Sequence, residues 1–119
     1  MNLKTVLVVD DSKLAQLLTK KTIQHSFPGW KVLSALSAEE GLLAIEKHQI
    51  DVVLLDFNMP GMSGLEMAQQ VMKKAPNLTV HLVTANTQDK MRERAEALGI
   101  GFISKPVSEA KLLTALSAV

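Results

Sequence analysis

The chain has 119 residues, a formal net charge of +1 and no cysteine. This length suits one domain, which we expect to cover residues 1–119 and to bury about two thirds of its unfolded surface. The near-zero charge gives no argument for nucleic-acid binding, and the missing cysteines exclude disulfides and thiolate metal sites. With no secretory h-region and no apolar run near the ~20 residues of a membrane span, we expect a cytoplasmic protein.

Five segments have the composition of β-strands in a mostly buried sheet. They are Thr5–Val9, Lys31–Ala35, Val52–Leu55, Thr79–Val83 and Gly101–Ser104. Unbroken runs of Val, Leu and Ile are typical of parallel strands covered on both faces. The mixed polarity of Lys31–Ala35 instead indicates a position at the edge of the sheet.

A helix is expected after each strand. Four of the helices begin at a serine that can cap the first turn, namely Ser12, Ser37, Ser63 and Ser108. The remaining one, fourth in the chain, follows the loop at 85–87 and runs to about Leu98. The spacing of Leu14, Leu17 and Leu18 predicts that these side chains form the inward face of the first helix.

Strand and helix alternate five times along the chain. This alternation predicts an α/β fold, a doubly wound, five-stranded parallel sheet with helices on both faces and right-handed crossovers. In such a sheet the carboxyl ends of all strands lie along one edge. If the strand order reverses between the first and third strands, a ligand site is expected at that point.

Polar residues close four of the five strands. They are Asp10 with Asp11, then Asp56, Thr84 and Lys105. Because clustered carboxylates repel one another, they require a cation unless some of them hold a proton. Oxygen ligands without cysteine or histidine suit Mg²⁺, with Mn²⁺ as the alternative.

A metal ion, an ammonium group and a hydroxyl are together equipped to receive a phosphoryl group. The metal and Lys105 would neutralise the phosphoryl oxygens, and Thr84 would donate a hydrogen bond to one of them. A carboxylate could then be the nucleophile and form an acyl phosphate. Asp56 is the natural candidate because it stands alone on the central strand.

These residues, together with the Met59-Pro60-Gly61 turn, Gly64 and Pro106, resemble the receiver domains of response regulators in two-component signalling. The chain is most similar in plan to the single-domain chemotaxis regulators, and the resemblance covers essentially all of it. It implies a flavodoxin-like receiver fold with the strand order 2-1-3-4-5. It also implies a phosphoacceptor switch that is not an enzyme beyond its own phosphorylation and dephosphorylation.

The resemblance assigns roles to the residues at the site. Asp56 would accept a phosphoryl group from the phosphohistidine of a sensor histidine kinase or a phosphotransfer protein. Asp11 and Asp56 would ligate Mg²⁺ directly, Asp10 mainly through water, and Asn58 through its backbone carbonyl. Lys105 would pair with the phosphoryl group.

The resemblance also implies how phosphorylation is transmitted. Thr84 would move onto the phosphoryl group, and the switch aromatic, Phe102 here in place of the commoner Tyr, would fill the vacated space. The face of the fourth helix, fifth strand and fifth helix would then change its affinity for an output protein. The Lys105–Pro106 bond is commonly cis in the family. We expect a monomer or a phosphorylation-dependent dimer that contacts neither nucleic acid nor membrane.

Several alternatives remain at this point. The chain could be a phosphorelay intermediate, a receiver module from a larger regulator, or an adaptor that no longer cycles. A haloacid-dehalogenase-type phosphatase needs a second Asp two residues after the nucleophile, where this chain has Asn58. A flavodoxin would bind a phosphate in the first loop, which is acidic here. Asn58 and Asn86 are expected to influence the lifetime of the phosphoryl group.

Overall fold

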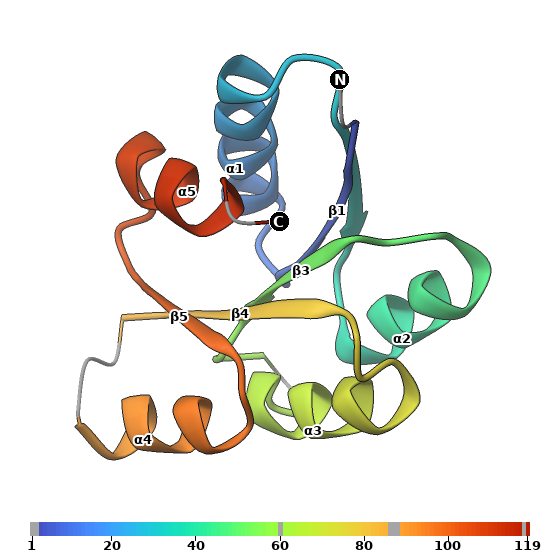
Figure 1. The fold of residues 1–119 in the computed structure, drawn as a ribbon, viewed down its shortest axis with the longest axis vertical. Coiled ribbons are helices and arrows are strands. Elements are labelled where there is room, and N and C mark those ends of the chain that lie inside the picture. Colours follow the sequence, from blue (N-terminus) through green and yellow to red (C-terminus); the bar gives the residue numbers. More distant parts are fainter. Residues whose placement is uncertain (1–2, 60, 86–88, 118) are drawn as a thin grey trace.

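Five parallel strands lie in the order β2-β1-β3-β4-β5, as expected from the sequence (Figure 1). They are β1 (Thr5–Val9), β2 (Lys31–Ala35), β3 (Val52–Asp56), β4 (Thr79–Thr84) and β5 (Gly101–Ser104). The computed structural model describes residues 3–59, 61–85, 89–117 and 119. Within these ranges, no helix combines the length and the apolar character that crossing a bilayer requires.

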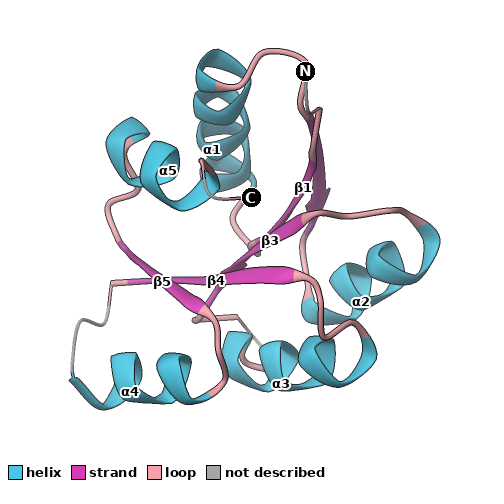
Figure 2. Cartoon of the chain, in the orientation of Figure 1, coloured by secondary structure: helices cyan, strands magenta, loops and turns pink. Residues whose placement is uncertain are grey.

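Five helices cover the two faces of the sheet (Figures 1 and 2). They are α1 (Lys13–Ser26), α2 (Ala38–Lys47), α3 (Gly64–Lys74), α4 (Asp89–Ala97) and α5 (Glu109–Leu116). The helices α1 and α5 lie on one face, and α2, α3 and α4 lie on the other (Figure 2). The four predicted capping serines each accept a hydrogen bond from a backbone N–H in the first helical turn.

The sheet separates two apolar cores. Because side chains alternate along a strand, Leu7 and Val9 of β1 enter the core beneath α2, α3 and α4, whereas Val6 and Val8 enter the core beneath α1 and α5. All residues of β3 are buried. The central strand is therefore fixed by packing on both faces, and its last residue, Asp56, is held where the sheet ends.

The predicted inward face of α1 is wrong. Leu14, Leu17 and Leu18 are 67%, 48% and 56% exposed, whereas Gln16 and Ile23 are the buried residues of this helix. With 3.6 residues per turn, Gln16 and Ile23 share one side and lie roughly half a turn from Leu14 and Leu18. The helix is oriented by a polar anchor as well as by an apolar one, which a count of leucines does not detect.

Gly64, the first residue of α3, packs directly against the end of β3. Its N–H donates to the carbonyl of Phe57 at 3.2 Å. A Cβ atom at this position would lie 2.5 Å from the carbonyl oxygen of Asp56 and 2.9 Å from Cα of Phe57. Both atoms belong to the backbone and cannot rotate away, so a side chain here would displace α3 from the strand that carries Asp56.

We expect Gly64→Ala to lower the free energy of unfolding by about 1–3 kcal/mol, the usual cost of overpacking. Urea denaturation measures this change. Gly41→Ala is the matched control, because its Cβ would first meet the terminal methyl group of Met67, a flexible atom that can move. An unchanged stability in Gly64→Ala, or an equal loss in the two variants, would contradict this account of the close approach.

Candidate functional site

The carboxylates of Asp10, Asp11 and Asp56 meet at the carboxyl edge of the sheet. One oxygen atom from each lies within 4.8 Å of the others. Asp10 follows β1 and Asp56 ends β3, and these strands are neighbours, so the topology itself brings the two acids together. Asp10 and Asp56 are 8% and 5% exposed, whereas Asp11 is open to solvent. The acidic cluster thus has two buried members and one exposed member.

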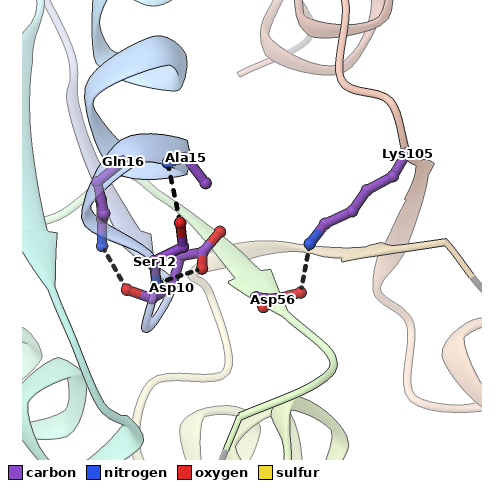
Figure 3. Close-up of polar contacts among 6 residues, drawn as sticks. All are labelled: Asp10, Ser12, Ala15, Gln16, Asp56 and Lys105. Carbon is purple, nitrogen blue, oxygen red and sulfur yellow. Dashed lines mark hydrogen bonds and ion pairs between the residues drawn. The ribbon is translucent and has the colours of Figure 1, made fainter.

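Asp56 forms an ion pair with Lys105 across the site (Figure 3). The Nζ atom of Lys105, which follows β5, lies 3.0 Å from Oδ1 of Asp56. The contact lacks hydrogen-bond geometry, and Oδ1 accepts no hydrogen bond from the residues that the structure describes. The charge of Lys105, and not a hydrogen bond, therefore compensates this buried carboxylate oxygen.

Asp10 is held through its backbone and its side chain (Figure 3). Its N–H donates to the carbonyl of Ala35 at 3.0 Å, and its Oδ1 accepts from the N–H of Ser12 at 2.9 Å. Burial raises the pKa of Asp10 above the ordinary value of 3.8, and the Asp56 carboxylate raises it further. The N–H of Ser12 and the charge of Lys105 act in the opposite direction.

Gln16 is a residue of this site that the sequence analysis missed. Its amide nitrogen lies 2.9 Å from the carbonyl oxygen of Val8, 3.1 Å from that of Asp10 and 2.7 Å from that of Ala35. Figure 3 shows the amide reaching from α1 to the backbone of Asp10. The signal available in the sequence was the seven-residue spacing from Ile23, which places both on one helix face.

Thr84 and Lys105 occupy neighbouring strand ends. Thr84 closes β4, is fully buried, and its carbonyl accepts a hydrogen bond from the N–H of Lys105 at 2.8 Å. The Lys105–Pro106 peptide bond is cis, as the family resemblance implied. The structure therefore brings the predicted hydroxyl and ammonium residues to the same sheet edge as the three carboxylates.

Three further predicted residues are Asn58, Phe102 and Asn86. Asn58 is exposed, two residues beyond Asp56, and the metal-binding role of its carbonyl stays a prediction. Phe102 is half-buried on β5, where the guanidinium carbon of Arg92 from α4 lies 4.9 Å from the ring centroid. Asn86 falls outside the described residues.

The acidic cluster has the donor chemistry of a site for a hard divalent cation. Two carboxylates about 5 Å apart repel each other by about 3 kcal/mol at an effective dielectric constant of about 20. The ammonium group of Lys105 beside Asp56 offsets only part of the charge carried by three carboxylates. The donors are all oxygen atoms and one of them, Oδ1 of Asp56, is buried without a hydrogen bond, which fits Mg²⁺ or Mn²⁺.

A cavity of about 270 Å³ opens beside the cluster. Its wall includes Asp10, Asp56 and Lys105, and it continues beneath α1 and Pro106 along apolar side chains such as Leu18. Most of the other residues that line the cavity, such as Leu54 and Val83, are apolar. A small anion approaching Asp56 would meet both an ammonium group and a partly dry environment.

Comparison with known proteins gives one consistent family. The family model described as "Response regulator receiver domain" matches residues 6–117. The chain is 30% identical to Protein PilH of Pseudomonas aeruginosa over 117 residues, which cover 96% of this chain and 95% of PilH. It spans about half the length, or less, of several other curated relatives that it matches.

Two solved structures show the same arrangement of the chain. Chemotaxis protein CheY4 of Vibrio cholerae superimposes with a TM-score of 0.89 at 29% identity, covering 99% of each chain. Response regulator TrrA of Thermotoga maritima, solved in complex with Mg²⁺ and beryllium fluoride, gives a TM-score of 0.86 at 29% identity, covering 98% of each chain. The similarity extends over the whole sheet and its helices.

We expect Asp10→Asn to stabilise the protein at pH 7 without divalent cations, by roughly 1–2 kcal/mol, because a buried charge beside Asp56 is removed. The raised pKa of Asp10 means that the native state binds its proton more tightly than the unfolded chain does, so this group's contribution to stability falls as pH rises above 3.8. The gain should therefore shrink as the pH falls below 3.8, because Asp10 then becomes protonated in the unfolded chain as well as in the native state.

Urea denaturation in EDTA at pH 7 and at pH 3.5 measures both differences. Asp89→Asn, at an exposed acid on α4, is the control and should give no gain. A wild-type protein more stable than Asp10→Asn at pH 7 would contradict the charge account.

Proposed function

The chain belongs to the response regulator receiver family of two-component signalling, and on this premise we propose that Asp56 accepts a phosphoryl group from a phosphohistidine. Membership makes the domain a phosphoacceptor switch rather than a classical enzyme. The observation that carries the proposal is the position of Asp56. It is a buried carboxylate that lies 3.0 Å from the ammonium group of Lys105, within a cluster of three acids.

The proposed chemistry is an in-line transfer to the carboxylate. An oxygen of Asp56 attacks phosphorus, the bond from phosphorus to the imidazole nitrogen breaks, and its electron pair returns to the ring. The product is an acyl phosphate on Asp56 and a histidine on the donor. Lys105 is placed to pair with the oxygens of the transferred group, and Thr84 is proposed to donate a hydrogen bond to one of them.

The proposal includes a divalent cation, Mg²⁺ by preference and Mn²⁺ as the alternative. Asp10, Asp11 and Asp56 would hold it with the carbonyl of Asn58, and the support is the oxygen donor set of the cluster. When bound, the cation supplies positive charge that offsets the carboxylates and the phosphoryl oxygens. The complex of TrrA with Mg²⁺ and beryllium fluoride supports the same assignment by similarity.

The phosphodonor is proposed to be a histidine kinase or a phosphotransfer protein of the cytoplasm. A phosphoryl group carried on a protein side chain reaches Asp56 only if the donor protein covers the rim of the site. Leu18 of α1 is 56% exposed and lines the cavity beside Asp56 and Lys105, so it supplies apolar surface there. This apolar rim supports a protein donor and gives no feature that suits nucleic acid.

The output is proposed to pass through the face formed by α4, β5 and α5. Phosphorylation would draw Thr84 toward Asp56 and let Phe102 move inward, shifting the population of two conformations. Phe102 already contacts Arg92 on α4, so a movement of the ring would change this contact with the helix. This proposal has three variants that share the same switch. The domain could control a separate output protein, pass the phosphoryl group on as a phosphorelay intermediate, or act as a module of a larger regulator.

We expect Asp56→Asn to abolish labelling by radioactive acetyl phosphate in the presence of Mg²⁺, because the amide lacks a nucleophilic carboxylate oxygen. Labelling is measured on the intact, folded chain. Asp89→Asn is the matched control and should label like wild type, since Asp89 is exposed on α4. Persistent labelling of Asp56→Asn would remove Asp56 from its proposed role.

Hydrogen exchange tests the proposed output face. With beryllium fluoride and Mg²⁺ together, we expect exchange to change in α4, β5 and α5, while α2 (Ala38–Lys47) keeps its rates. Exchange with Mg²⁺ alone is the control for metal binding. If labelling occurs at Asp56 but exchange in α4 and β5 stays the same, the domain is an acceptor without the proposed conformational output.

A further inference from the structure

We propose that Gln16 is a positioning residue for the acidic cluster, holding the backbone of Asp10 so that Asp10 and Asp11 stay close to Asp56. The inference rests on the cation site of the proposed function and concerns how the chain keeps that site assembled. Gln16 acts through backbone groups and is not proposed to touch the cation or the phosphoryl group.

The side-chain amide of Gln16 joins the ends of two neighbouring strands. Its nitrogen lies within 3.1 Å of the carbonyl oxygens of Val8 and Asp10, on and just beyond β1, and of Ala35, which ends β2. An amide nitrogen has two hydrogens, so one of them is shared between carbonyls. The carbonyl of Ala35 also accepts the N–H of Asp10, so the amide of Gln16 is a second donor to it and links it to the carbonyl of Asp10.

The backbone of Asp10 is fixed on both sides by this arrangement. Its N–H donates to the carbonyl of Ala35, and its own carbonyl is the one that faces the amide of Gln16. Asp11 follows directly in the chain, so the same contact limits how far either carboxylate can move away from the sheet. The remaining contact of Asp10, between its Oδ1 and the N–H of Ser12, is local to the loop and does not tie it to β2.

The restraint opposes a force that acts within the site itself. The carboxylates of Asp10 and Asp11 lie within 4.8 Å of that of Asp56, and their repulsion pushes the loop after β1 outward. Lys105 forms its ion pair with Asp56 and not with the two acids of the loop. A site that must receive a cation benefits from carboxylates that are already in place, because their ordering then costs less free energy when the ion binds.

The cost of this anchor is visible in the amide oxygen. Gln16 is 6% exposed, yet its Oε1 accepts no hydrogen bond from the described part of the chain. A buried acceptor without a donor is unfavourable, so the position would favour an apolar side chain if packing were its only role. The N–H groups of the amide therefore explain why a glutamine occupies this position, because they face the backbone carbonyls next to the acidic cluster.

The test compares wild type, Gln16→Met and Gln70→Met. Methionine has a similar length and no donor, and Gln70 is an exposed glutamine on α3 that serves as the matched control. Isothermal calorimetry with Mg²⁺ alone should show about tenfold weaker binding in Gln16→Met, the low end of the effect of removing a residue that orients metal ligands. The control should bind like wild type.

A kinetic measurement separates positioning from general damage. We expect the Mg²⁺ concentration for half-maximal labelling by acetyl phosphate to rise about tenfold in Gln16→Met, while the rate at saturating Mg²⁺ changes by less than about threefold. If Gln16→Met is unfolded at 25 °C, Gln16→Asn replaces it, because the shorter amide cannot reach all three carbonyls.

Each outcome decides the proposal. Equal Mg²⁺ affinity in Gln16→Met and wild type overturns the role of Gln16 and leaves the proposed function intact. If Gln16→Met binds Mg²⁺ more weakly than wild type, and acetyl phosphate does not label the wild-type protein, the role of Gln16 is supported and the proposed function is removed. A wild-type protein that binds no Mg²⁺ overturns both.

Discussion

The structure depends on holding three like charges together at one edge of a parallel sheet. Asp10 and Asp56 lie at the ends of neighbouring strands that pack on both faces, so the two cores fix where their backbones begin to leave the sheet. Lys105 offsets part of the charge, and a divalent cation would offset the rest. The polar chemistry of this chain is therefore a consequence of where its strands end.

The same sheet links the site to the surface on which a partner would act. Thr84 and Lys105 end adjacent strands, and a backbone hydrogen bond joins them. Phe102 lies on β5 just before this point and touches Arg92 of α4. A change at Asp56 thus has a short route, through strand ends and one aromatic ring, to the face of α4, β5 and α5.

The strands and the acidic cluster were predictable because they follow from simple regularities, whereas the sheet order came from the family resemblance. Apolar runs mark buried strands, acids directly after them mark the sheet edge, and parallel topology brings these ends together. The face of α1 was not predictable in this way, since Leu14, Leu17 and Leu18 outnumber the buried Gln16 and Ile23. Gln16 is buried because its amide contacts backbone carbonyls at the ends of β1 and β2, and these carbonyls come together only in the folded chain.

The most direct test is a titration of Mg²⁺ into the ¹⁵N-labelled protein, followed by backbone NMR. The account predicts one saturable set of shifts at the ends of β1, β3 and β5, around Asp10, Asp56 and Lys105. Shifts that never saturate, or that spread over exposed acids such as Glu39 and Glu93, would contradict it, because the three carboxylates would then not form one cation site.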